Sequence, residues 1–553
     1  MHTDPGTRPH PARPHPARRG AAALAVLLLA SGCAGGAYGA ALDGPAPSDP
    51  GVLRIAMTSS NIPLTGTYPD NGYEGFRFVG NNLYDGLTRL NLDQEDELPT
   101  PQPALAESWE HDESLQVWTF HLRDGVTFHD GTPFDADAVV FALDRVKDPE
   151  SQWYDPTTAA RSATITKYWA SWRKVDDLTV EVTTTQPYAY VPWDAAGLYI
   201  GSPTAIKRWG NQLYPQHASG TGPFRMTRLV DGQVMEMVRN EDYWRGPAEL
   251  ERIELYPAPE AATRLSMLQS GQVNFADAPS PDAIELLEAE GYAVKLAEYP
   301  HGIMPRFNLW RAPFKENPTL RKALNYAIDR EGTAALVNGS GIPATQYVYD
   351  GHPHHVADNP GYSYDPDLAR RLLAEAGYEP GELSLTMAYP AGGSGNMYPD
   401  PMMQKLQMDF RAVGVELKLL PLEWNTIITI GIDGLQAPQW SHIDILWASP
   451  AAGMMPPGYA STFFCFRGPE VPNAVGLCDE RIDDALNTAM ATPGADQQHA
   501  SIQQAMDVAI DEAYFLFWVH DLNLRVLAPD VHGYQKVQSW WLDFTTYTVG
   551  SDQ

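Results

Sequence analysis

The chain is poor in cysteine and in basic residues, and its apolar segments are short. Three Cys among 553 residues exclude a disulfide-dense scaffold. Lys and Arg number 38 against 69 Asp and Glu, which gives a formal net charge of -31. This acidity argues against nucleic acid as a partner and against electrostatic attachment to anionic lipid. The apolar stretch at residues 21–30 is far too short to span a bilayer.

The sequence also lacks the common motifs of hydrolases and nucleotide-binding enzymes. It contains no HExxH, no GxSxG and no Walker loop, and the AGGSG at residues 391–395 has its glycines off by one from a nucleophile elbow. The pair Asp483 and Asp484 is expected on a helix surface, where it serves solvation rather than acid–base chemistry. We therefore expect no enzyme and no cofactor, and a secreted hydrolase is the alternative from another class.

One cluster of histidines is the best candidate for a metal site. It combines His352, His354, His355, Asp350 and Asp358. Because the cluster lies in proline-rich surroundings, with no scaffold to fix tetrahedral geometry, we interpret it as a solvated loop. We therefore expect no bound metal.

The N-terminus has the pattern of a lipoprotein signal. Basic residues precede the apolar stretch, and Ala30, Ser31 and Gly32 lead directly to Cys33. We expect a signal peptide over residues 1–32, lipid on Cys33 and a flexible Gly/Ala/Pro-rich tether over 33–50. Ordinary secretory cleavage near Ala40 is the alternative. A lipidated Cys33 leaves Cys465 and Cys478, and an even pair in an exported protein suggests a disulfide.

Length and composition predict several packed units of mixed structure. A chain of 553 residues suggests about three to four domain units, and 44% apolar residues exclude wholesale disorder. Residues 117–122 alternate apolar and polar side chains, which is typical of a half-buried strand. A helix is expected after Asp135, which can cap its first turn, with Val139 and Leu143 on one face.

Several motifs in order along the chain resemble one protein family. Residues 104–147, which contain LAESWE and LRDGVTFHDGTPF, resemble the hallmark segment of the peptide/nickel-type solute-binding proteins of bacterial ABC importers. The likeness continues through GTGPF at 220–224, RNEDYW at 239–244, LSMLQSGQVNF at 265–275, RKALNYAIDR at 321–330 and YDP to AGY at 364–378. Asn274 stands where the family usually has aspartate. The resemblance extends from about Val52 to Tyr547.

This resemblance implies an α/β, two-lobe periplasmic-binding-protein-like fold of type II, in the large cluster with an extra subdomain. Lobe I would comprise residues 51–303 and 521–553, with the subdomain inserted at about 78–196, and lobe II residues 304–520. The protein would be a monomer, lipid-anchored to the outer face of the cell membrane, or periplasmic in a host with two membranes. It would capture a small organic solute, a peptide or peptide-like molecule, and deliver it by hinge closure to an ABC permease and ATPase complex.

Resemblance to oligopeptide-binding members also implies a ligand site. Trp424 matches a tryptophan that packs against ligand side chains, and Trp447 matches one beside the ligand main chain, although both could be packing residues. The remaining candidate ligand-binding residues are Ser449, Met454, Met455 and Tyr459, which would complete an adaptable, mostly apolar wall.

A charge that peptide binders usually carry is missing. Peptide binders usually have an aspartate after the second tryptophan, for the peptide ammonium, and residues 448–455 contain none. A pocket without that carboxylate should favour another head group or supply the charge elsewhere, and our hypothesis is that free peptides are not preferred. Saccharides, opines and metal chelates are alternative solutes, and presentation of the solute to a sensor protein is an alternative use.

Overall fold

The computed structural model describes residues 48–70, 72–393, 396, 398–449, 456–468 and 471–550. All of them belong to one compact unit, Gly44–Gln553. Within the described residues, no helix combines the length and the apolar character that a membrane span requires.

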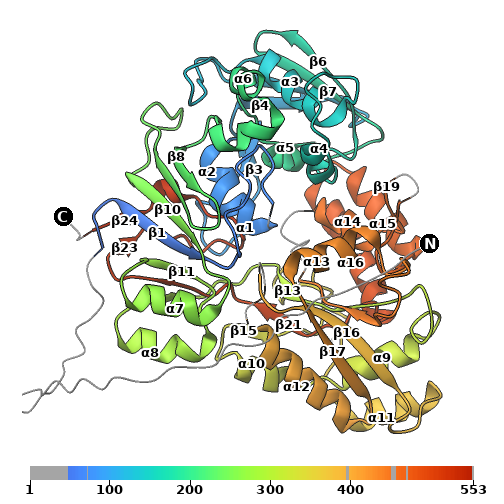
Figure 1. Ribbon diagram of the computed structural model, residues 1–553. Coiled ribbons are helices and arrows are strands. Elements are labelled where there is room, and N and C mark those ends of the chain that lie inside the picture. The colour runs from blue at the N-terminus through green and yellow to red at the C-terminus, as the bar shows by residue number, and fades with distance from the viewer. Residues whose placement is uncertain are drawn as a thin grey trace, which may run out of the picture. The chain divides into compact units, whose positions relative to one another are not determined.

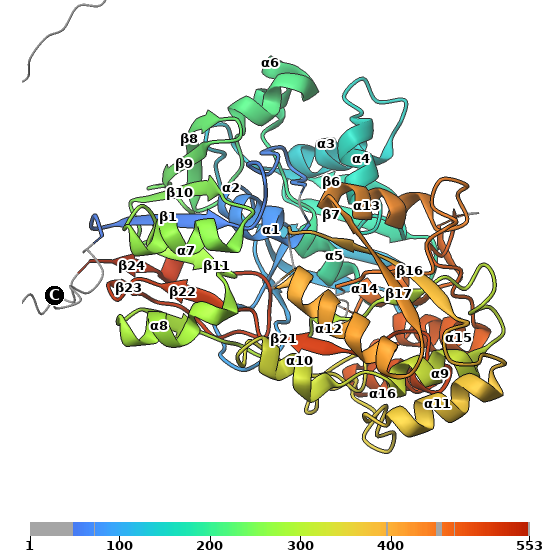
Figure 2. The same ribbon diagram turned by 60° about the horizontal axis from the view of Figure 1, so that its bottom comes forward.

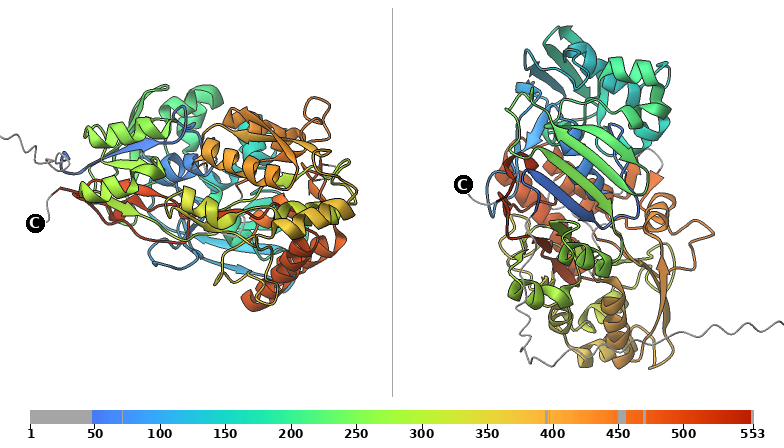
Figure 3. Two further views of the ribbon diagram at one scale, coloured as in Figure 1. Left: turned by 90° about the horizontal axis from the view of Figure 1, so that it is seen from below. Right: turned by 60° about the vertical axis from the view of Figure 1, so that its left-hand side comes forward.

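The largest sheet has seven strands and joins both ends of the described chain (Figure 1). Its order is β12 (Ala293–Lys295), β22 (Arg525–Leu527), β11 (Phe275–Asp277), β1 (Val52–Met57), β10 (Arg252–Pro257), β9 (Val234–Arg239) and β8 (Phe224–Val230). The central β1 runs parallel to β10 and β11, whereas β8, β9 and β22 pair antiparallel with their neighbours. The blue and green strands of this sheet lie side by side in the right-hand view of Figure 3.

Short helices cover this sheet, and two short strands near the C-terminal end of the described chain pair with each other. α7 (Ala261–Gln269) contacts β1 and β11, and α8 (Ile284–Ala289) contacts β12. Figure 2 shows α7 beside β1 and β11. Smaller elements of the same region are α1 (Tyr73–Gly75), the π-helix Phe76–Gly80, α2 (Asn81–Leu83), the 3-10 turns Pro281–Ala283 and Phe544–Thr546, β23 (Val531–His532) and β24 (Thr548–Val549). Asn274, just before β11, accepts from the Arg54 amide and donates to the Val52 carbonyl, which joins it to β1.

A second sheet of four strands is formed by the middle of the chain. Its order is β14 (Arg306–Phe307), β18 (Ile445–Leu446), β16 (Ser384–Pro390) and β17 (Glu416–Leu422). The strands β16, β17 and β18 are parallel, with α12 (Pro399–Ala412) after β16 and α13 (Trp424–Asp433) after β17. Further helices of this part are α9 (Pro318–Tyr326), α10 (Arg330–Leu336), α11 (Pro366–Glu375), α14 (Gly458–Phe463), α15 (Glu480–Met490) and α16 (Ala495–Asp511). The hairpin of β19 (Phe466–Gly468) and β20 (Val471–Pro472) lies between α14 and α15 in the chain.

The chain passes between the two large sheets through paired strands. β13 (Gly302–Ile303) leads from the first sheet to the second, and β21 (Val519–Asp521) leads back. They pair antiparallel, Gly302 with His520 and Ile303 with Val519, and β15 (Gly341–Pro343) pairs with the other edge of β21. The two passages therefore form a single short sheet.

A third, antiparallel sheet is inserted between β1 and β8 in the sequence. Its order is β4 (Ala106–His111), β5 (Val117–Leu122), β7 (Thr179–Thr184) and β6 (Trp169–Asp176), and α3 (Ala136–Lys147) contacts β6 and β7. Other elements of this insertion and its borders are β2 (Thr88–Leu90), β3 (Pro101–Pro103), α4 (Pro156–Ser162), α5 (Val191–Gly197), α6 (Pro203–Leu213) and the 3-10 turn Tyr214–His217.

The locally predicted elements are confirmed. In β5 the side chains of Trp118, Phe120 and Leu122 are buried, as the alternation predicted. Asp135 caps α3 by accepting from the Ala138 amide at 3.0 Å. Asp365 caps α11 in the same way.

Candidate functional site

A cavity of about 560 Å³ lies between the seven-stranded and the four-stranded sheet. From the first sheet it is lined by residues 58–60, which follow β1, and by 259–261 and Arg264, which follow β10. From the second it is lined by residues 391–393, 396 and 398–401 after β16 and by 421–425 at the end of β17. These are the carboxyl ends of parallel strands in both sheets, where open α/β sheets bind their ligands.

The charged groups that the cavity presents to solvent are carboxylates. Arg264 is 2% exposed, and its two terminal nitrogens donate to the carbonyls of Ala258, Pro259 and Ala278 at 2.5 to 2.8 Å. Burial lowers the pKa of this guanidinium. Three acidic side chains line the same cavity and are exposed: Glu260, Asp400 and Glu423. Within the described part of the chain, these three carboxylates have no ion-pair partner, so the wall is acidic.

Trp424 is placed in the cavity by two local features. Glu423 caps α13 by accepting from the Asn425 amide at 2.8 Å, so the helix begins at Trp424 directly after β17. On the other side, Gly393 has a φ of 104°, and a Cβ at this position would lie 2.8 Å from the Trp424 side chain. Only glycine allows the loop after β16 to approach the indole so closely.

Thr58 gives the opposite wall a buried anchor. Its amide and hydroxyl both donate to the Glu74 carboxylate, at 2.5 and 2.7 Å. Burial raises the pKa of Glu74, and the nearby Asp277 raises it further. The cavity wall after β1 is thus fixed to a buried carboxyl group rather than left as a free loop.

The comparisons with known proteins agree with this arrangement. A family model described as bacterial extracellular solute-binding proteins, family 5 middle region, matches residues 100–469. The chain belongs to this family. It is 28% identical over 473 residues to heme-binding protein A of Haemophilus influenzae, covering 78% of this chain and 81% of that protein. It is 26% identical over 515 residues to the dipeptide-binding protein of Escherichia coli, covering 88% and 95%.

Solved structures show the same fold. A dipeptide binding protein from Pseudoalteromonas, crystallised with Met-Leu, superposes with a TM-score of 0.77 at 20% identity, covering 90% of this chain and all of that one. The protein therefore has the two-lobe periplasmic-binding-protein-like fold that the motifs predicted. Family 5 proteins are extracytoplasmic binding components of ABC importers, and the predicted membership is confirmed.

Of the predicted ligand-binding residues in this family 5 protein, Trp424 is among the described residues that line the cavity, whereas Trp447, Ser449 and Tyr459 are not. Trp447 is 2% exposed and its ring lies 6.1 Å from that of Trp518. Tyr459 is also buried. Ser449 is half-buried, and Met454 and Met455 lie outside the described residues. The ligand roles of all six residues, Trp424 included, stay predictions.

The expectation that the histidine cluster forms a solvated loop is wrong for two of its histidines, although the segment is a loop in which Asp350 and Asp358 are exposed. His352 and His354 are buried, and α14 and α16 supply the neighbours Tyr459 and His499 of His354. The His354 Nδ1 lies 2.7 Å from the Tyr459 hydroxyl, and its Nε2 lies 3.0 Å from Nδ1 of His499. Burial lowers the pKa of His354 well below its usual value. Within the described part of the chain, no group of three or more His, Cys, Asp or Glu side chains is arranged to hold a metal ion.

Two predicted features lie near α15: the cysteine pair Cys465 and Cys478, and the acidic pair Asp483 and Asp484. Cys465 and Cys478 are joined by a disulfide, which ties the end of α14 to the start of α15. Asp484 is exposed as expected, but Asp483 is half-buried, because its carboxylate accepts from the Cys465 amide at 3.2 Å. Burial raises the pKa of Asp483.

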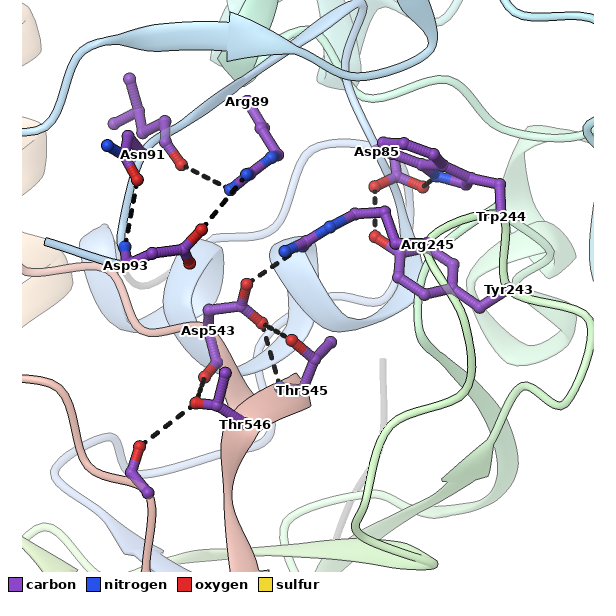
Figure 4. A network of polar contacts seen from close by, with 12 residues as sticks. Asp85, Arg89, Asn91, Asp93, Tyr243, Trp244, Arg245, Asp543, Thr545 and Thr546 are labelled. Atoms are coloured by element: carbon purple, nitrogen blue, oxygen red, sulfur yellow. Dashed lines mark hydrogen bonds and ion pairs between the residues drawn. The ribbon is translucent and has the colours of Figure 1, made fainter.

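The RNEDYW motif serves structure rather than the cavity (Figure 4). Tyr243 and Trp244 both donate to the Asp85 carboxylate, at 3.0 and 3.1 Å, and Arg245 donates to Asp543 at 3.0 Å. Burial raises the pKa of Asp85. These contacts join the loop before β2 to the loop after β9 and to the C-terminal segment.

Sequence reasoning missed most of the cavity. Residues 58–60, 259–264 and 398–401 carry no motif that we singled out, although they follow strands or begin helices. Their common signal is position at the carboxyl end of a parallel strand, and this signal becomes usable only when the strand order is known.

Proposed function

We propose that the protein captures a peptide or peptide-like solute outside the cytoplasmic membrane and delivers it unaltered to an ABC permease. The observation that carries this proposal is the cavity whose walls come from the strand ends of both large sheets. A solute there touches both lobes at once, and a ligand stabilises a closed form only through contacts that the open form lacks. Delivery then follows from closure, because the loaded form differs in shape from the empty one.

The proposed lobes follow the sheets. Lobe I would comprise residues 51–303 and 521–553, which include the seven-stranded sheet, with the subdomain at about 78–196 containing β4 to β7. Lobe II, residues 304–520, would contain the four-stranded sheet. The pairing of β13 with β21 supports a hinge at the two passages, because both passages can bend together.

We further propose that the acidic wall replaces the carboxylate that is missing after Trp447. A buried ammonium needs a counter-charge. The carboxylates of Glu260, Asp400 and Glu423 line the cavity and have no ion-pair partner within the described part of the chain. On this proposal a free peptide binds through its cationic group at this wall, which revises the expectation that free peptides are disfavoured.

Calorimetric titration tests the function. The titration would use tripeptides with a free amino terminus and the same peptides after acetylation. It would also include saccharide, opine and nickel-chelate solutes. Scattering measurements would follow the compaction of the protein. We expect the free peptides to bind more tightly than the acetylated ones and to compact the protein. Turnover of a solute, or no compaction with any of these solutes, would contradict the proposal.

Trp424→Ala is expected to weaken solute binding about tenfold or more, because a cavity-lining indole contributes on the order of 2 kcal/mol through buried apolar area. The matched control is Trp440→Ala, another half-buried tryptophan, which donates to Asp433 at 2.9 Å and does not line the cavity. Calorimetry on both variants with the same peptides gives the comparison. Equal affinities of the two variants would remove Trp424 from the site.

Attachment to the membrane is proposed through lipid on Cys33, which lies outside the described residues. The signal-like leader and the extracytoplasmic place of the family support it. In the producing cell, Cys33→Ala is expected to move the protein from the membrane fraction to the soluble fraction. Mass spectrometry of the wild-type protein should show a lipid-modified N-terminal cysteine, and an unmodified terminus near Ala41 would favour ordinary secretory cleavage.

A further inference from the structure

A side-chain bridge connects the two lobes beside the cavity. Asp282 lies in the 3-10 turn Pro281–Ala283, between β11 and α8 of the first sheet's region. Its carboxylate accepts a hydrogen bond from the Tyr398 hydroxyl and another, at 3.2 Å, from the Asn338 side-chain amide. The same amide donates to the Pro281 carbonyl at 3.2 Å. Both partners of Asp282 belong to the region of the four-stranded sheet.

The two partners connect this bridge to the hinge and to the cavity. Asn338 lies between α10 and β15, and β15 pairs with the returning strand β21, so Asn338 is close in the chain to the passage between the lobes. Tyr398 directly precedes α12 and lines the cavity. Its hydrogen bond to Asp282 raises the pKa of the Tyr398 hydroxyl. The position of a cavity-lining ring is therefore held by a carboxylate from the opposite lobe.

We infer that Asp282 is a closure-determining residue, a latch that holds the two lobes together through Tyr398 and Asn338. The inference rests on the proposed function, because a latch matters only if the lobes open. Contacts of 3.2 Å or less between the lobes exist only when the lobes are close. Such contacts shift the equilibrium toward the closed form by their own free energy. The latch should therefore slow solute dissociation and leave association nearly unchanged.

The experiment compares Asp282→Asn, Tyr398→Phe and the double variant. Without solute, each single variant is expected to enlarge the radius of gyration in scattering measurements, because fewer molecules are closed. With tri-alanine as probe, each should raise the dissociation constant about five- to tenfold, as expected for one charge-assisted hydrogen bond. The effects of the two changes should be less than additive in the double variant, because both weaken the hydrogen bond between Asp282 and Tyr398. Glu285→Gln, at an exposed position of α8 close to the turn, is the matched control.

A further variant tests the bridge from the other side. Asn338 has a φ of 48°, which aspartate tolerates, so Asn338→Asp should fold. It would place two carboxylates together and should open the solute-free protein more than Asp282→Asn does. Unchanged scattering in all three single variants, or strictly additive effects of Asp282→Asn and Tyr398→Phe, would overturn the latch. A third outcome is that the variants open but the wild-type protein does not bind tri-alanine. That result would support the latch and contradict the proposed peptide solute.

Discussion

Replacing Asp277 by alanine is expected to lower the free energy of unfolding by about 3–5 kcal/mol, because it leaves two buried guanidiniums without their counter-charge. Asp277 ends β11 in the middle of the seven-stranded sheet. Its carboxylate accepts from Arg77 and lies 3.7 Å from Nε of Arg525. The side chain of Asp277 is 4% exposed, and those of Arg77 and Arg525 are each 1% exposed.

The surroundings of this cluster cannot replace the lost carboxylate. The remaining acid, Glu74, is already bound by both donors of Thr58. Within the described part of the chain, Nε and Nη1 of Arg77 have no hydrogen-bond partner, and burial lowers the pKa of Arg77. Removing Asp277 therefore leaves the buried Arg77 guanidinium with even fewer hydrogen-bond acceptors.

Urea denaturation of wild type and Asp277→Ala measures the effect, with Asp231→Ala in an exposed turn as control. The control should change stability by less than about 0.5 kcal/mol, as is usual for surface positions. A loss of less than about 1 kcal/mol in Asp277→Ala would show that the cluster contributes little. Solute affinity should fall together with stability, because Arg77 and Asp277 act electrostatically on Glu74, which holds the cavity wall at Thr58.

The sequence predicted those features whose signals are local. The alternation in β5, the cap of Asp135 and the sequence from Asp365 to Gly377 each depend on residues a few positions apart, and each element was found where it was predicted. The fold class could be predicted in the same way, because the motifs occur in order along most of the chain and the family model confirms them.

Features that depend on distant segments were not predictable. The Arg77–Asp277 pair joins positions 200 residues apart, and neither residue stands in a pattern that marks it. The proline-rich surroundings of His354 predict a solvated loop, yet Tyr459 and His499 cover this side chain from helices more than 100 residues away. The site followed the same rule: Trp424 came from a local motif, whereas Thr58 and Tyr398 became recognisable only through the arrangement of the sheets.

Several histidines are buried in the neutral form, and we expect each of them to contribute a loss of stability as the pH falls below 6.5. Burial lowers the pKa of His520 to about 3 and that of His129 to about 4. In the unfolded chain these side chains bind a proton near pH 6.5, so between that pH and the folded pKa the unfolded state holds more protons. The contribution of each histidine is thus fully present above pH 6.5 and decreases as the pH falls toward its folded pKa.

His520 gives the sharpest test, because it lies in the returning strand β21 at the proposed hinge and its pKa is lowered to about 3. Between pH 7.5 and pH 5, wild type should lose about 2 kcal/mol more than His520→Gln, since one neutral buried histidine costs about 1.4 kcal/mol per pH unit below 6.5. Buried carboxyls with raised pKa values, such as Asp194, act in the opposite direction but equally in both proteins, so they cancel in the difference. Urea denaturation at both pH values measures this difference in stability loss. The control His121→Gln, on the exposed face of β5, should lose as much stability as wild type. Parallel losses in wild type and His520→Gln would mean that His520 titrates as freely in the folded protein as in the unfolded chain.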